Sequence, residues 1–198
     1  MIRSKICFPV FFFLLIAVSA VAQEKSSKPN VIFIYVDDLG YGDISYNGAT
    51  AIKTPSIDAL AKKGLNFTNG HCTSATCTPS RYALMTGKYP WRDKGHNILT
   101  GDAPLIISTT ELTLPKVFKQ AGYATGIVGK WHLGLGETTT KDWNGDIKPG
   151  PNEVGFDYSF IFPATADRVP SIFMENHRVI GIDKNDSIKV SYKQKIGN

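Results

Sequence analysis

The sequence predicts an α/β fold in which helices cover a mostly parallel sheet. Runs of β-branched and aromatic residues alternate along the chain with amphipathic segments of helical period, and this order is typical of parallel strands joined by helices. The first run, NVIFIYVDDLG at 30–40, is apolar on both faces of an extended chain. A strand of that kind belongs in the middle of a covered sheet, where ligands bind beyond the carboxyl ends of the strands.

Residues 1–22 are expected to be a signal peptide and not part of the fold. Arg3 and Lys5 precede FPVFFFLLIAV, an apolar stretch too short to span a membrane, and small residues follow at 20–22. Cleavage after residue 22 would leave a domain at 23–198 that is exported to the periplasm or the cell exterior, without stable membrane insertion. An N-terminal membrane anchor is the alternative.

Three helices are expected, at 54–64, 79–87 and 113–122. The first has Thr54 as its cap, a proline in its first turn and Gly64 as its stop. Each of the three segments carries an apolar face that a neighbouring layer would bury.

Strands are expected at 65–70, 123–130 and 158–162, because these short runs are rich in aromatic and β-branched residues. Segment 171–182 reads as a hairpin that turns at Glu175-Asn176-His177. The polar stretch at 137–153 is a long loop, and loops of this length are more often functional or mobile than idle.

The charge balance excludes some partners. The formal net charge is +5, and it falls to +3 once Arg3 and Lys5 are removed. No block of lysine and arginine is present, so nucleic acid is not expected to be a partner. A small anionic substrate is compatible with this mild positive charge.

Two adjacent carboxylates, Asp37 and Asp38, follow the first apolar run. Either they cap the turn after that strand, or they bind a hard divalent cation, which prefers carboxylate oxygens. Two carboxylates at one strand end repel each other unless a cation lies between them. The residues alone leave both interpretations open.

A second candidate site lies in GKWHLG at 129–134, which carries Lys130 and His132 two residues apart. If the chain is extended there, both side chains share a face and Trp131 points into the core. A lone histidine is more often a surface residue or a hydrogen-bonded core residue. A lysine on the same face at a strand end favours a functional role.

Cys77 opens the short motif CTPSR at 77–81. A single cysteine is most often a small buried residue, and in an exported protein it could also pair with Cys72. The motif is more specific than either interpretation. With the apolar pair and Thr-Gly at 84–87, it resembles the C-x-P-S-R signature of type I sulfatases of the alkaline phosphatase superfamily. GYAT at 122–125, which leads to GKWH at 129–132, resembles their second signature.

The resemblance extends from about Asn30 to the end of the chain, and DDLG at 37–40 also matches. It implies that a maturase oxidises Cys77 to formylglycine (3-oxoalanine), an aldehyde. One hydroxyl of its hydrate would attack sulfur and expel the alcohol; the second would lose its proton, so that a C–O bond breaks and sulfate leaves. Asp37, Asp38 and the group at position 77 would bind one Ca²⁺ ion.

Three further roles follow from the resemblance. Arg81 would hold the hydrate and offset its charge. Lys130 would bind sulfate oxygens, as a point charge where negative charge develops. His132 would hydrogen-bond the hydrate and take its proton in the collapse step.

Part of the family pattern is missing from this sequence. Family members are typically more than twice as long, and further along they carry a second pair of metal ligands, another lysine and another histidine. Asp183 and Asp186 lie in a polar turn and are weak candidates for that pair. We therefore expect 23–198 to be a truncated, N-terminal part of a sulfatase domain.

The leading functional prediction is a sulfuric ester hydrolase that acts on a sulfated carbohydrate, a polysaccharide or glycosaminoglycan. The alternatives are a phosphonate or phosphodiester hydrolase of the same superfamily and an inactive, truncated remnant. Segment 155–181 resembles bacterial sulfatases of sulfated polysaccharides. Its Asp167, Arg168 and His177 are candidate substrate contacts, although a surface ion pair and a hairpin tip explain them equally well.

Overall fold

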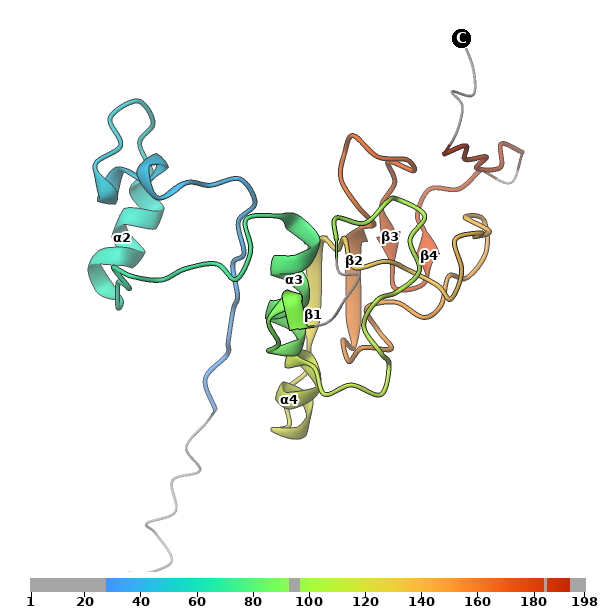
Figure 1. Cartoon of the computed structure of the whole chain (residues 1–198), viewed down its shortest axis with the longest axis horizontal. Coiled ribbons are helices and arrows are strands. Elements are labelled where there is room, and N and C mark those ends of the chain that lie inside the picture. Colours follow the sequence, from blue (N-terminus) through green and yellow to red (C-terminus); the bar gives the residue numbers. More distant parts are fainter. Residues whose placement is uncertain (1–27, 93–96, 184, 193–198) are drawn as a thin grey trace, which may run out of the picture.

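The computed structural model describes residues 28–92, 97–183 and 185–192 (Figure 1). The expected signal peptide at 1–22 lies outside these residues and stays a prediction. None of the helices in the described ranges combines the length and the apolar character that crossing a membrane requires.

A four-stranded sheet forms the centre of the structure. Its strands lie in the order of the sequence: β1 (Gly126–Lys130), β2 (Tyr158–Phe162), β3 (Met174–Glu175) and β4 (Arg178–Val179). β1 and β2 are parallel, with Gly126 opposite Tyr158, whereas the other two pairs are antiparallel. The predicted α/β class is confirmed, and the sheet within the described residues is mixed. The predicted hairpin at 171–182 is confirmed as well.

The three predicted helices are present as α2 (Pro55–Lys63), α3 (Cys77–Thr86) and α4 (Leu114–Gln120). Short 3₁₀ turns lie at η1 (Tyr41–Asp43), η2 (Ser45–Asn47) and η3 (Pro90–Arg92). In Figure 1, α3 and α4 are neighbours beside β1, whereas α2 stands apart with η1 and η2.

Helix α3 begins two residues before the predicted start at Pro79. Thr76 is still extended, and its carbonyl accepts the first helical hydrogen bond from the Ser80 amide. Pro79 therefore falls within the first turn, where a missing N–H costs nothing. This earlier start makes Cys77 the first helical residue.

The hydrophobic core lies between α3, β2 and the segments that surround them. Trp131 is buried there, as the sequence predicted. The largest apolar side chains that are almost fully buried with it are Tyr82, Ile107, Leu133, Ile161, Met174 and Val154.

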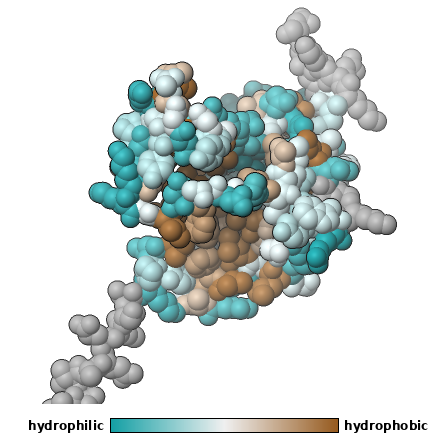
Figure 2. All heavy atoms as spheres, turned by 60° about the vertical axis from the view of Figure 1, so that its left-hand side comes forward, coloured by the Kyte–Doolittle hydropathy of each residue, from teal (hydrophilic) through white to brown (hydrophobic). Residues whose placement is uncertain are grey.

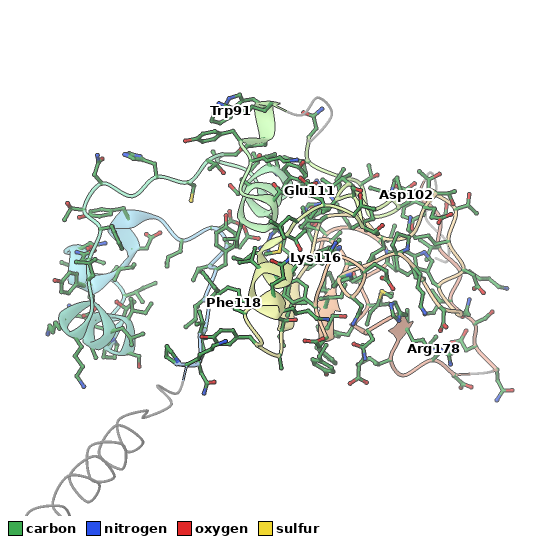
Figure 3. The ribbon with its side chains drawn as sticks, turned by 90° about the horizontal axis from the view of Figure 1, so that it is seen from below. Trp91, Asp102, Glu111, Lys116, Phe118 and Arg178 are labelled. Carbon is green, nitrogen blue, oxygen red and sulfur yellow. The ribbon has the colours of Figure 1, made fainter. Side chains whose placement is uncertain are left out.

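The predicted central strand at 30–36 is wrong for this structure. The segment has no strand partner among the described residues, and its apolar side chains are exposed; Ile32 is 83% accessible. Among its contacts, Phe33 meets Phe118 of α4 edge to face, with 6.0 Å between ring centroids. Figure 3 labels Phe118 at α4, next to this segment.

Two further elements are exposed where burial was expected. Segment 65–70 is irregular, with a turn at 68–69, and is not a strand; Leu65 is 80% accessible. On α2, Leu60 is 65% accessible, so the apolar face of that helix is uncovered. The space-filling view, which brings this side forward, shows hydrophobic residues gathered on the surface (Figure 2). The apolar residues of these segments follow the pattern of buried elements. The described residues of the structure, however, do not cover these apolar side chains.

One carboxylate ties α4 to the sheet. Asp157, next to β2, accepts hydrogen bonds from the amide and hydroxyl of Thr125 at 2.8 and 3.0 Å and pairs with Lys119 of α4 at 2.7 Å. These contacts, the Lys119 hydrogen bond foremost, lower the pKa of Asp157 to about 2.

The lowered pKa of Asp157 gives a prediction for acid stability. A carboxyl with a lowered folded-state pKa stabilises the fold above its unfolded value of 3.8, and this contribution is lost as the pH falls toward about 2. We expect Asp157→Asn to flatten the fall in unfolding free energy over this range, measured by urea unfolding at a series of pH values. An equally steep fall in wild type and variant would contradict this assignment.

Candidate active site

The first turn of α3 is held in place by its own polar side chains. Thr78 and Ser80 are buried, whereas Cys77 is half-buried at the start of the helix. The Ser80 hydroxyl donates to the Ser74 carbonyl at 2.5 Å, which fixes the chain just before the helix. Position 77 is therefore presented at a rigid helix N-terminus, where the macrodipole favours negative charge.

Lys130, the last residue of β1, lies against this helix start. Its Nζ is 3.0 Å from Cys77 Sγ and donates a hydrogen bond to the Asp37 carboxylate. Arg81 completes the group, because its Nη1 donates to the Lys130 carbonyl at 2.7 Å and its Nη2 is 3.5 Å from Asp37 Oδ2. Four predicted site residues, from three distant parts of the sequence, thus form one cluster.

The two cations of this cluster stabilise the charge on Asp37. The hydrogen bond from Lys130 is the largest cause that lowers the pKa of this carboxyl; partial burial opposes it, and the charges of Lys130 and Arg81 add to the lowering. Asp38 is exposed, with a left-handed φ of 56°. Both aspartates line an open hollow of about 340 Å³ with Cys77 and Arg81.

The donor set fits a hard divalent cation in kind and falls short of one in number. Asp37 and Asp38 supply the carboxylate oxygens that Ca²⁺ prefers, but typical calcium sites use about six to eight oxygens. Within the ranges that the structure describes, no three His, Cys, Asp or Glu side chains converge in a metal-binding group. Lys130 and Arg81 also compete for the Asp37 oxygens.

His132 is held in a strained and buried position beyond the strand. β1 ends at Lys130, and His132 has a left-handed φ of 54°, so the alternation assumed for residues 130 and 132 does not hold. The residue is 1% accessible, with Nε2 2.9 Å from both the Leu99 carbonyl oxygen and Arg168 Nη1. Gly134 closes the turn, since a Cβ there would lie 1.8 Å from the Pro104 carbonyl oxygen.

The environment of His132 disfavours its charged form. Burial is the main cause that lowers its pKa, and the positive charges of Lys130, Arg168 and Arg81 add to this effect. The hydrogen bond with the Leu99 carbonyl opposes them. Its Nδ1 atom is buried and has no hydrogen-bond partner within the described residues.

Thr78 is a site residue that the sequence reasoning missed. Its hydroxyl donates to the His132 carbonyl at 2.9 Å and accepts from the Leu99 amide at 3.3 Å, and its side chain is fully buried. Thr78 thereby joins the helix start at Cys77 to the segment that carries His132. The available signal was a hydroxyl residue inside the CTPSR motif itself.

The missed role of Thr78 gives a second prediction. Thr78→Val keeps the side-chain shape but leaves the His132 carbonyl and the Leu99 amide without their buried partner. We expect a loss of about 1–3 kcal/mol in the free energy of unfolding, measured in urea, and Thr78→Ser to retain most of the stability. Equal stability of the valine and serine variants would show that these two hydrogen bonds contribute little.

The predicted substrate contacts are not all gathered at the cluster. Arg168 is half-buried and reaches His132, whereas Asp167 is exposed beside it. His177 lies in the hairpin turn, with Nε2 2.8 Å from Glu153 Oε1. No contact among the described residues joins His177 to the cluster around Cys77.

Both described cysteines are free. Cys72 is exposed and Cys77 is half-buried, and they form no disulfide in this structure. The alternative that pairs them is therefore wrong here, which leaves the thiol of Cys77 beside Lys130 to be explained by chemistry at position 77.

In this α/β fold, two cationic side chains and a carboxylate surround the first residue of a helix. This arrangement defines the class of site as one that binds anions. Comparisons with known proteins identify the family. A family model described as Sulfatase matches residues 29–177. The N-acetylgalactosamine-6-O-sulfatase of Bacteroides thetaiotaomicron is 54% identical over 175 residues, which are 88% of this chain and 34% of that protein. The arylsulfatase G of Homo sapiens is 35% identical over 162 residues, 82% of this chain and 29% of that protein.

The fold comparison agrees. One of the solved structures is described as part of the metabolism of multiple glycosaminoglycans by Bacteroides thetaiotaomicron. It matches with a TM-score of 0.83 at 54% identity, over 87% of this chain and 36% of that one. The chain belongs to the sulfatase family and has the alkaline-phosphatase-like fold of its N-terminal part. It spans about a third of the length of the curated relatives that it matches.

Proposed function

We propose that this chain carries the nucleophile and half of the anion site of a formylglycine-dependent sulfatase. The observation that supports this best is the distance of 3.0 Å between Lys130 Nζ and Cys77 Sγ at the first residue of α3. Here the Cys77 sulfur stands in for the oxygen atoms of the matured group. A lysine so placed can bind an anion that is attacked from position 77.

Formylglycine at position 77 would supply a geminal diol, in which one hydroxyl attacks sulfur and the other allows sulfate to be released. The residues of the chain hold and polarise what surrounds it. Lys130 would bind sulfate oxygens, and the N-terminus of α3 adds favourable potential for the developing negative charge. Arg81, whose Nε is buried without a partner among the described residues, would donate to the hydrate.

Asp37, Asp38 and the group at position 77 would hold a divalent cation, which in this family is usually Ca²⁺. It would supply Lewis-acid polarisation of the attacking hydroxyl. The two carboxylates line the same hollow as Cys77, which supports this assignment.

We further propose a sulfated carbohydrate as the substrate, because the relative with 54% identity is named for a sulfated amino sugar. Asp167, Arg168 and His177 are the candidate substrate contacts of this chain. Cleavage of residues 1–22, export to the periplasm or cell exterior, and maturation of Cys77 by a dedicated maturase belong to the same proposal.

The test uses a chimaera in which residues 23–198 replace the matching third of the Bacteroides thetaiotaomicron sulfatase, co-expressed with a formylglycine-generating maturase. We expect it to hydrolyse an aryl sulfate, and 6-sulfated N-acetylgalactosamine faster than the 4-sulfated isomer. A chimaera that prefers an aryl phosphate diester would favour the phosphodiesterase alternative. A folded, matured chimaera without activity on any of them would contradict the proposal.

A further inference from the structure

Two exposed aromatic side chains, Tyr89 and Trp91, stack on each other just after α3. Their ring centroids are 4.2 Å apart, and the two ring planes differ by 21°. Trp91 is 66% accessible and Tyr89 is 46% accessible, whereas the other two tryptophans, Trp131 and Trp143, are buried. Figure 3 shows Trp91 at the outer edge of the molecule. The pair has no role in the chemistry proposed at position 77.

The turn that carries the two rings is fixed by the backbone around it. Gly87 ends α3 with a left-handed φ of 69°, and the 3₁₀ turn η3 follows. The Arg92 amide donates to the Tyr89 carbonyl at 3.1 Å, and Pro90 between the two rings is buried. A ligand that stacks on this pair therefore orders little of the chain, which keeps the entropic cost of binding low.

Cationic side chains lie in the sequence on both sides of the pair. Lys88 pairs with the Glu111 carboxylate. Arg92 is exposed, and no side chain of 28–92, 97–183 or 185–192 pairs with its guanidinium. The flanking sequences, TGK and RDKGHN, are polar, so the apolar surface here is small for a membrane or a protein partner. A flat aromatic face beside an unpaired cation suits a ligand with one apolar face and an anionic group.

We propose that Trp91, supported from behind by Tyr89, forms a surface binding site for a sulfated glycan chain together with Arg92. The C–H groups on one face of a pyranose ring carry partial positive charge, and the face of an indole ring is negative. A guanidinium donates two parallel hydrogen bonds to an oxyanion such as sulfate. The choice of a sulfated glycan rests on the proposed function, whereas the exposed pair does not.

The site lies at the opposite end of α3 from the proposed nucleophile. The helix has ten residues, of which Cys77 is the first, and a rise of 1.5 Å per residue separates its ends by about 15 Å. Trp91 would therefore hold a part of the glycan other than the sulfate group that is cleaved. Binding at both places raises the local concentration of a polymer at the site and does nothing for a small substrate.

Acrylamide quenching of tryptophan fluorescence tests the site in the full chain, expressed without a maturase so that the glycan stays intact. Because Trp131 and Trp143 are buried, the quenchable fluorescence reports on Trp91. The probe is chondroitin 6-sulfate, a polymer of uronic acid and 6-sulfated N-acetylgalactosamine, and the comparison is the same polymer after desulfation. Vesicles of phosphatidylglycerol and phosphatidylcholine test a membrane surface as the alternative, and calorimetry gives the affinities of the variants.

We expect chondroitin 6-sulfate to shield Trp91 from acrylamide and to bind at least about fivefold more tightly than the desulfated polymer. Trp91→Ala should weaken binding about tenfold, and Trp91→Tyr, which keeps an aromatic face, should retain most of it. Arg92→Met should lower the affinity for the sulfated polymer to that for the desulfated one. The matched control is Arg178→Met, which should leave both affinities unchanged, since Arg178 pairs with Asp146 and lies away from Trp91 (Figure 3).

The inference is overturned if the sulfated polymer leaves the quenching of wild type unchanged, or if Trp91→Ala binds it as tightly as wild type does. Equal affinity for the two polymers, or an Arg178→Met variant that loses as much as Arg92→Met, would also overturn it. Shielding by vesicles and not by the glycan would assign the pair to a membrane surface instead. If the alanine variant does not fold, wild type and the two arginine variants still decide the matter. None of these readings depends on sulfatase activity, so a failure here is distinct from a failure of the proposed function.

Discussion

Cys77→Ala in the chimaera is expected to lower sulfatase turnover by more than about a thousandfold, because it removes the group that attacks sulfur. Cys72→Ala is the matched control, since Cys72 is an exposed free thiol five residues away. It should keep most of the turnover. Initial rates on an aryl sulfate measure both, and near-normal turnover of a purified Cys77→Ala enzyme would remove the proposed nucleophile from the account.

Cys77→Ser separates the nucleophile from the release step. A serine hydroxyl can accept the sulfuryl group but offers no second hydroxyl to expel sulfate. Without a maturase that acts on serine, we expect almost no turnover and a sulfated serine that mass spectrometry detects. Full turnover with an unmodified serine would contradict the mechanism.

The chain of residues 23–198 by itself is expected to bind Ca²⁺ weakly and to show little or no hydrolysis of an aryl sulfate. It offers Asp37, Asp38 and position 77 to an ion that typically takes about six to eight oxygens. Water must fill the remaining places, and Asp37 is already engaged by Lys130 and Arg81.

Calorimetry with Ca²⁺ should give an affinity at least roughly tenfold weaker than that of the chimaera, which corresponds to ~1.4 kcal/mol. Asp38→Asn in the chimaera should weaken binding in the same direction. Robust, calcium-dependent hydrolysis by the chain alone would show that its own residues complete the site.

The elements that form from local information were predictable from the sequence. α2 has its start and stop where Thr54 and Gly64 indicated them, and β1 and β2 lie at the predicted aromatic and β-branched runs. The first turn of α3 differed by two residues because Pro79 is tolerated at more than one position of a first turn.

The predicted strand at 30–36 could not be decided locally. An apolar, extended segment becomes a strand only when neighbours pair with its backbone and cover both faces. The described residues supply some contacts, such as that with Phe118, and leave Ile32 and Ile34 exposed. The pattern of apolar residues therefore predicted a strand that the described residues do not form.

The site divides in the same way. Motif residues predicted the cluster of Cys77, Lys130 and Asp37, which the structure brings together. The contacts of Arg168 and Thr78 with His132 depend on how distant loops pack, for which a single sequence has no period or spacing rule. His132 itself was placed on the wrong assumption, because its left-handed backbone breaks the alternation of the strand.

The central claim is that position 77 becomes an aldehyde, and mass spectrometry of one peptide tests it most directly. Trypsin releases residues 64–81, which contain both Cys72 and Cys77, from protein co-expressed with the maturase. We predict that a carbonyl oxygen replaces the sulfur at position 77 while Cys72 keeps its thiol. An unmodified thiol at Cys77, under conditions in which the Bacteroides thetaiotaomicron relative is converted, would contradict the account.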